Sequence, residues 1–227
     1  MKPPNETVFL FDADNTLFDN DGFRQDLRER LAAAHGDRAS ARYWEIMDEL
    51  WDKLGYMDYF GALERLRIEG PHDLAIFQTA NWILDYPFAD RLYPRALEAV
   101  SHARQWGLPV LLTDGDAVLQ SRKIMRSGLW KAFDDHVLIY IHKEKELDDV
   151  AHRYAAAHYA LIDDKSRILA AVKRAWGDRV TTIFPKQGHY AVQEPPTDIA
   201  TVDMTIDKIG DLLEYEFTPI RPKASGH

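Results

Sequence analysis

Hydrophobic and polar positions divide most of the chain into short apolar segments and stretches of helical spacing. Five apolar or β-branched segments end at polar or glycine-containing loops, as strands buried on both faces do. They cover Thr7 to Phe11, Pro109 to Thr113, Val137 to Ile141, His158 to Ile162 and Val180 to Phe184. Helical patterns accompany the last four, over Ala96 to Trp106, Ala117 to Arg126, Leu147 to Ala156 and Ser166 to Trp176. This alternation predicts an α/β fold, a doubly wound, Rossmann-like parallel sheet with helices on both faces.

The connection between the first two predicted strands is unusually long. About ninety residues lie there, far more than one crossover helix needs. Residues Phe23 to Asp85 have apolar positions at helical spacing, as at Tyr43, Met47, Leu50 and Leu54. We therefore expect an inserted helical cap over residues 21–87, on a core of residues 1–20 and 88–227. The expected linkers are Phe18 to Gly22 and Pro87 to Pro94, which are rich in turn-forming residues.

Charge and composition narrow the classes of partner. The chain has 28 Lys and Arg against 37 Asp and Glu, a net charge of −9, and no basic block that would follow a nucleic-acid backbone. Its apolar runs are short, and the first residues show no signal-like apolar stretch. We expect a cytoplasmic protein that binds neither nucleic acid nor membrane. Because the chain has no cysteine, disulfides, thiolate metal sites and a cysteine nucleophile are excluded.

Two carboxylates, Asp12 and Asp14, follow directly on the first apolar strand in the segment Phe9-Leu10-Phe11-Asp12-Ala13-Asp14-Asn15-Thr16-Leu17. In open parallel sheets, ligands bind at this end of the strands. Carboxylates at positions i and i+2 can divide chemical work, one attacking or holding a metal and the other transferring a proton. The alternative is an acidic turn in which Asn15 and Thr16 serve only as turn formers.

At this point the sequence resembles the haloacid dehalogenase-like hydrolase superfamily, whose first motif is an apolar strand followed by Asp-x-Asp-x-Thr/Val. The resemblance continues in order along nearly the whole chain. Thr113-Asp114-Gly115 is similar to the second motif, Lys143 to the third, and Leu161-Ile162-Asp163-Asp164 to the fourth. Each segment follows or ends a predicted strand. The resemblance implies the α/β core with a helical cap, and an enzyme.

The same resemblance assigns roles for binding phosphate. Thr113 would offer its hydroxyl and Asp114 its backbone N–H to a phosphoryl oxygen, with Gly115 allowing close approach of the backbone. Lys143 would neutralise phosphoryl oxygens and keep the nucleophilic carboxylate ionised. Lys145, two positions further on, is the alternative lysine.

A Mg²⁺ site is implied by the same motifs. Its ligands would be Asp12, the backbone carbonyl of Asp14 and Asp164, with Asp163 as a further ligand or a supporting group. The competing interpretation is that the Asp163–Asp164 pair caps the helix that starts at Ser166. The chain departs from the common family pattern at Ile168, where another acid is usual.

The second acid of the first motif distinguishes the chemistries of the family. Phosphatases use an Asp there to protonate the leaving group and then to deprotonate water, whereas dehalogenases and phosphonatases lack it. Asp14 therefore favours a magnesium-dependent phosphatase that hydrolyses a small phosphorylated metabolite through an aspartyl-phosphate on Asp12. The alternatives are a phosphomutase, a haloacid dehalogenase, or a non-catalytic phospho-accepting module. We expect a monomer or a homodimer.

Several other residues are weaker candidates. Lys186 and His189 follow the fifth predicted strand and could border the same cleft. In the cap, the candidates for facing substrate are Asp21, Arg24, Tyr56 and Asn81. The cap is also rich in aromatic residues, most of which we expect in its own core: Trp44, Trp51, Trp82, Tyr56, Tyr59 and Phe60.

Overall fold

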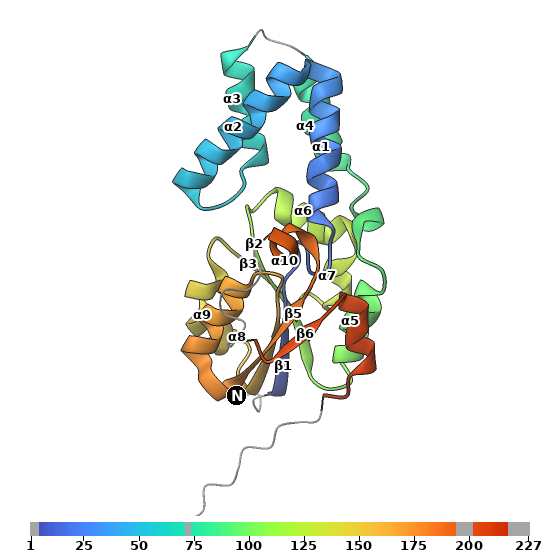
Figure 1. Cartoon of the computed structure of the whole chain (residues 1–227), viewed down its shortest axis with the longest axis vertical. Coiled ribbons are helices and arrows are strands. Elements are labelled where there is room, and N and C mark those ends of the chain that lie inside the picture. Colours follow the sequence, from blue (N-terminus) through green and yellow to red (C-terminus); the bar gives the residue numbers. More distant parts are fainter. Residues whose placement is uncertain (1–4, 71–73, 194–201, 218–227) are drawn as a thin grey trace, which may run out of the picture.

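The computed structural model describes residues 5–70, 74–193 and 202–217. Within them, six strands form one parallel sheet in the order β3-β2-β1-β4-β5-β6 (Figure 1). The strands are β1 (Asn5–Phe11), β2 (Leu108–Asp114), β3 (Val137–Tyr140), β4 (Ala156–Ile162), β5 (Val180–Pro185) and β6 (Met204–Ile206). This confirms the predicted α/β fold.

Two helical layers cover the sheet. On one face lie α5 (Ala96–Ala103), α6 (Leu119–Arg126), α7 (Leu129–Ala132) and the 3₁₀ helix η5 (Ile209–Glu214); on the other lie α8 (Leu147–Arg153) and α9 (Ser166–Trp176). Strand β1 shows why both layers are needed, because its side chains alternate between them. Phe9 and Phe11 pack in the first layer, whereas Val8 and Leu10 pack in the second. The central strand is therefore buried on both faces.

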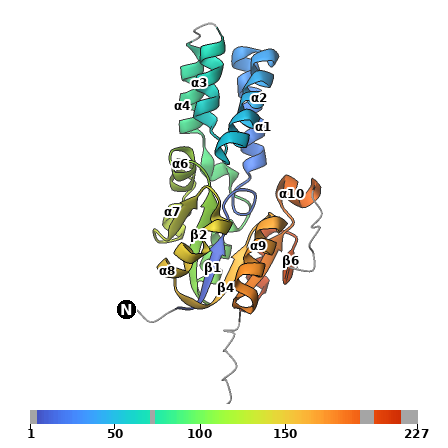
Figure 2. The same ribbon diagram turned by 90° about the vertical axis from the view of Figure 1, so that its left-hand side faces the viewer.

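Four helices stand above the carboxyl ends of the strands (Figure 2). They are α1 (Asn20–His35), α2 (Asp37–Leu54), α3 (Tyr59–Glu69) and α4 (Ala75–Asp85). These helices, called the cap below, enclose a hydrophobic cluster of their own that includes Leu27, Tyr43, Met47, Leu63 and Ile83. The cluster continues into the chain segments that join cap and core through Phe18 and Phe88. The cap thus has a core separate from the two layers of the sheet.

The structure differs from the sequence expectations in several short elements that were not predicted and in the ends of others. Strand β6 and the short helices α7 and α10 (Gly188–Gln193) were not predicted, because segments of three to six residues show too little periodicity. The helix expected over Leu147 to Ala156 ends at Arg153, and Ala156 already belongs to β4. The first expected linker is partly helical, because the Asp19 side chain accepts a hydrogen bond from Gly22 N at 2.9 Å and caps α1.

The described part of the chain also has the 3₁₀ helices η1 (Phe88–Arg91), η2 (Lys143–Lys145) and η3 (Gly177–Arg179). Among the described residues, no helix has the length and apolar character needed to cross a lipid bilayer.

Candidate active site

The first acidic motif lies in a tight turn at the end of β1. The Asp12 N–H donates a hydrogen bond to the Ile162 carbonyl at 2.9 Å, which extends the pairing of β1 with β4 by one residue. Within the turn, the Leu17 N–H donates a hydrogen bond to the Ala13 carbonyl at 2.9 Å. Asn15 has φ 61°, a left-handed conformation that asparagine adopts more readily than most residues. This turn holds Asp12 in the protein interior, whereas the Asp14 side chain is 22% exposed.

Lys143 is buried against the Asp12 side chain. Its Nζ lies 2.5 Å from Asp12 Oδ1 and 2.7 Å from Asp163 Oδ2, and it is the first residue of η2, just after β3. The Asp114 carboxylate accepts a hydrogen bond from Lys143 N at 2.7 Å, which fixes the η2 backbone. Lys145, the alternative in the sequence, is exposed. The structure therefore places Lys143, and not Lys145, beside Asp12.

The two acids after β4 have different surroundings. Asp163 Oδ1 accepts a hydrogen bond from Lys165 N at 2.9 Å, whereas Oδ2 has no hydrogen-bond partner among the described residues and forms only an ion pair with Lys143 Nζ at 2.7 Å. Neither carboxylate oxygen of Asp164 has a hydrogen-bond partner among the described residues, although the residue is fully buried. The Asp164 N–H, by contrast, is fixed by the Thr16 hydroxyl at 3.1 Å. Asp164 thus presents two unsatisfied oxygens in the interior, which is costly without a cation or a proton.

A divalent cation fits these acids. Asp12, Asp163 and Asp164 each offer an oxygen, and the three oxygens lie within 4.8 Å of one another. Asp12 Oδ2 also has no hydrogen-bond partner among the described residues. Buried carboxylate oxygens without other partners are the donor set that Mg²⁺ prefers. Both oxygens of Asp164 lack a partner among the described residues, whereas Asp163 has a hydrogen bond at Oδ1 and an ion pair with Lys143 at Oδ2, which favours Asp164 as the direct ligand.

Burial and charge shift the ionisation of this cluster. Burial raises the pKa of Asp164 well above its usual range, and the carboxylates of Asp12 and Asp163 raise it further. Burial alone would lower the pKa of Lys143, but the carboxylates around it, Asp12 first, raise that pKa above its ordinary value. Burial also raises the pKa of Asp114 to about 6, against the opposing effect of Lys143. The neighbouring carboxylates therefore favour the charged form of Lys143, and the buried Asp164 carboxyl needs a proton or a cation.

Thr113 is the last residue but one of β2 and lies next to a glutamine that the sequence did not single out. Gln120 Nε2 donates to Thr113 Oγ1 at 3.0 Å and to Asp14 Oδ2 at 3.3 Å. Gly115 allows this arrangement, because a Cβ there would lie 2.7 Å from the Gln120 side chain. The group that lies close to the Gly115 backbone in this structure is thus the Gln120 side chain. The sequence had suggested that a phosphoryl group would approach the backbone there.

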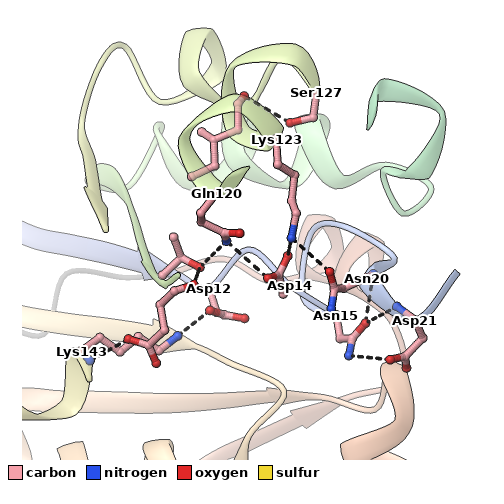
Figure 3. Close-up of polar contacts among 12 residues, drawn as sticks. Asp12, Asp14, Asn15, Asn20, Asp21, Gln120, Lys123, Ser127 and Lys143 are labelled. Atoms are coloured by element: carbon pink, nitrogen blue, oxygen red, sulfur yellow. Dashed lines mark hydrogen bonds and ion pairs between the residues drawn. The ribbon is translucent and has the colours of Figure 1, made fainter. Parts of the chain in front are cut away.

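Lys123 forms a second buried ion pair on the other side of the motif (Figure 3). Its Nζ lies 2.7 Å from Asp14 Oδ1 and 3.0 Å from Asn20 Oδ1. Sequence reasoning missed both Lys123 and Gln120. A signal was present, because both fall on the face of α6 that carries the buried Leu119 and Ile124, and polar residues on an apolar helix face need partners.

A cavity of about 600 Å³ lies between the cap and the sheet edge. Asp14, Asp114, Gln120, Lys123 and Lys165 line it from the core. The cap contributes Arg24, Trp51, Tyr56 and Tyr59. Such a cavity, bordered by titratable groups, is the usual setting of a ligand site.

The matches to known proteins agree with this architecture. The family model of the haloacid dehalogenase-like hydrolases matches residues 7–175, which carry all four motifs. The chain belongs to the haloacid dehalogenase-like hydrolases. This hydrolase is therefore an enzyme of that family. No functionally curated protein matches its sequence.

Solved structures share the fold of the hydrolase. A haloacid dehalogenase-like hydrolase from Burkholderia xenovorans LB400 is 51% identical, with 93% of this chain and 96% of that chain covered and a TM-score of 0.87. L-2-haloacid dehalogenase from Xanthobacter autotrophicus is 15% identical (91% and 96% covered, TM-score 0.58). The HAD-hydrolase YfnB from Bacillus subtilis, solved with magnesium bound, is 17% identical (92% and 97% covered, TM-score 0.59). The last two show the fold alone.

Of the weaker candidates for site residues, some line the cavity and others form contacts away from it. Arg24, Tyr56 and His189 line the cavity. Asp21 pairs with His189 Nδ1 at 2.6 Å, which joins α1 to α10. Asn81 is exposed on α4, where its side chain donates to the Phe77 carbonyl, and Lys186 pairs with Asp207 at the surface.

The cap aromatics of the hydrolase also divide. Trp44 and Tyr59 are buried in the cap cluster, and Phe60 and Trp82 pack against it, as expected. Trp51 is 39% exposed and lines the cavity with Tyr56. At the position where the family pattern has an acid, Ile168 is buried in the hydrophobic layer. Lys165, which the sequence did not suggest, lies on the cavity wall, and its pKa is raised by Asp12 and Asp164 despite its burial.

Proposed function

We propose that this hydrolase is a magnesium-dependent phosphatase of small phosphomonoesters, with Asp12 as nucleophile and Asp14 as proton-transfer residue. The observation that carries the proposal is the position of the second carboxylate. Asp14 lies two residues beyond Asp12 and lines the cavity, with its side chain partly exposed. A carboxylate at this place can give a proton to a leaving oxygen and take one from water.

The first half of the reaction forms an acyl phosphate on Asp12. Lys143 holds Oδ1 of Asp12 at 2.5 Å and leaves Oδ2 without a hydrogen-bond partner among the described residues. In the proposed step, an oxygen of Asp12 attacks phosphorus and the bond from phosphorus to the leaving oxygen breaks. Asp14 gives its proton to that oxygen as the alcohol departs. The Thr113 hydroxyl, the Asp114 N–H and the Lys143 ammonium would receive the charge of the phosphoryl oxygens.

The second half returns the enzyme to its starting state. Asp14, now ionised, accepts a proton from a water molecule whose oxygen attacks phosphorus. The bond between phosphorus and the Asp12 oxygen breaks, which releases inorganic phosphate, frees the Asp12 carboxylate and leaves Asp14 protonated as at the start. When bound at Asp12, the backbone carbonyl of Asp14 and Asp164, Mg²⁺ would supply positive charge that draws the anionic phosphate to an acidic site.

A phosphate-release assay tests the proposal. The panel contains phosphorylated sugars, nucleotides and organic acids, each with EDTA and with EDTA followed by excess Mg²⁺. We expect turnover of at least one monoester, loss of activity in EDTA and recovery with Mg²⁺. A parallel reaction with 2-chloropropionate measures chloride release. Chloride release without phosphate release would replace the phosphatase by a dehalogenase, and a single phosphorylation without turnover would indicate a phospho-accepting module.

A further inference from the structure

Lys123 is a buried cation whose only carboxylate partner, among the described residues, is the proposed proton-transfer residue. Its side chain is 2% exposed and its Nζ lies 2.7 Å from Asp14 Oδ1. The ammonium also lies 5.1 Å from the centre of the Phe18 ring and 5.9 Å from that of Phe23. Such an environment excludes water from most of the lysine. The ammonium group therefore interacts mainly with protein groups and little with water.

The Asp14 carboxylate is held at both oxygens by α6. Lys123 binds Oδ1, and Gln120 donates to Oδ2 at 3.3 Å. Both donors come from one turn of α6, so they fix the rotation of the carboxylate as well as its position (Figure 3). Asp14 also lines the cavity, and its side chain remains 22% exposed.

Lys123 also contacts the start of the cap. The Asn20 side-chain oxygen, 3.0 Å from Nζ, belongs to the first residue of α1, and Phe23 lies one turn further along that helix. A change in the position of α1 would therefore move two of the four groups that surround the ammonium. The lysine is a physical link between the cap helix and the Asp14 carboxylate.

We propose that Lys123 is a positioning residue that orients the Asp14 carboxylate toward the reacting oxygen. Through Lys123, the orientation of this carboxylate depends on the position of cap helix α1. The proposal rests on the proposed function, in which Asp14 transfers the proton. Lys123 itself forms no bond to substrate. A misplaced acid or base loses much of its effect, so the lysine would contribute to rate through Asp14 alone.

The test compares two probes that differ in their need for a proton. Phenyl phosphate has a poor leaving group, whereas the leaving group of p-nitrophenyl phosphate departs without protonation. First-turnover release of the phenol is measured for the wild type, Lys123→Met, Asp14→Asn and the double variant. We expect Lys123→Met to slow phenol release by about 10- to 100-fold and nitrophenol release by less than about 3-fold. Methionine keeps the length and apolar contacts of the lysine stem, so the melting temperature should change little.

The double variant distinguishes positioning from a structural role. If Lys123 acts through Asp14, adding Lys123→Met to Asp14→Asn should change phenol release by less than about 2-fold. A lysine needed only for packing would slow both probes equally and would keep its full effect in the Asp14→Asn background, which would overturn the inference. Lys131→Met on α7, which removes an exposed lysine, is the matched control and should behave as wild type.

Asn20→Ala tests the link to the cap without altering α6. It removes the second acceptor of the ammonium, and we expect phenol release to slow by about 3- to 10-fold with nitrophenol release nearly unchanged. This variant also serves if Lys123→Met does not fold. Wild-type rates in Asn20→Ala would show that the orientation of Asp14 does not depend on the cap helix. Failure of the proposed function has a different signature: Asp14→Asn itself would then treat the two probes alike.

Discussion

The sheet edge and the cap wall face each other across one cavity, yet they are built in opposite ways. At the edge, Asp12, Lys143 and Asp163 are buried and joined by ion pairs of 2.5 and 2.7 Å. On the cap wall, Trp51 is 39% exposed, and Arg24 is half-buried without a carboxylate partner among the described residues. From this difference we infer that the edge carries the proposed catalytic residues and that the cap wall contributes to the choice of substrate.

The cause lies in how each region folds. Parallel strands bring their carboxyl ends to one edge, so residues distant in sequence converge there once the sheet forms. The cap wall has no such constraint, because the cap is stabilised by its own cluster around Tyr43 and Met47. Exposed wall residues such as Trp51 can change without removing a side chain from that cluster. Substitutions at the edge should therefore alter chemistry, and substitutions on the wall should alter affinity.

The largest effect should come from Asp12→Asn. This change removes the proposed nucleophile, so phosphate release should fall by at least about 10⁴-fold with every substrate. Lys143 would keep Asp163 as an ion-pair partner at 2.7 Å, so the fold should persist. Phosphate release measures the loss, and circular dichroism checks the fold. Substantial residual turnover in a folded Asp12→Asn protein would exclude Asp12 as nucleophile.

The next largest effect is expected from Asp14→Asn, and it should depend on the leaving group. The first-turnover rate with phenyl phosphate should fall by roughly 10² to 10⁴-fold because its leaving group needs a proton. With p-nitrophenyl phosphate the first step should partly survive, while hydrolysis of the intermediate remains slow. Mass spectrometry after an acid quench should then detect phosphate trapped on Asp12. Equal losses with both probes and no trapped intermediate would leave Asp14 a role in metal binding or folding only.

The same contrast explains what the sequence could and could not predict. Asp12, Lys143 and Asp164 follow strands, and Thr113 is the last residue but one of β2. Their convergence was therefore predictable from the order of the motifs along the chain. The partners of Asp14 were not, because Lys123 and Gln120 lie on a helix whose orientation toward β1 depends on packing.

In the cap, helical spacing indicated helices but not which face would meet the core. Trp44 and Trp51 both looked like core residues, and only Trp44 is buried. Strand β6, three residues long, was missed because its pairing with β5 depends on contacts distant in sequence. The residues of the sheet edge are thus easier to predict from the sequence than the cap residues that face the cavity.

Asp114→Asn should change the pH dependence of stability. Burial raises the pKa of Asp114 from 3.8 to about 6, so in this interval the folded state keeps a proton that the unfolded chain has lost. The resulting stability is fully present below pH 3.8 and is lost by about pH 6. As pH rises across the interval, the free energy of unfolding of the wild type should fall by roughly 2 to 3 kcal/mol relative to Asp114→Asn. Urea denaturation at several pH values in EDTA measures the difference, and parallel profiles would contradict it.

The smallest effect is expected on the cap wall, from Arg24→Met. The Arg24 guanidinium lies 5.2 Å from the centre of the Trp44 ring and borders the cavity. A second anionic group on a substrate could pair with it, so KM for such substrates should rise about 10-fold while kcat changes little. Arg28→Met is the matched control, because Arg28 lies 4.7 Å from the same ring but is exposed and away from the cavity lining. KM for monoesters without a second anion should be unchanged in both variants. If Arg24→Met lowered kcat for every substrate instead, the cap wall would take part in the chemistry, and the division between edge and cap would fail.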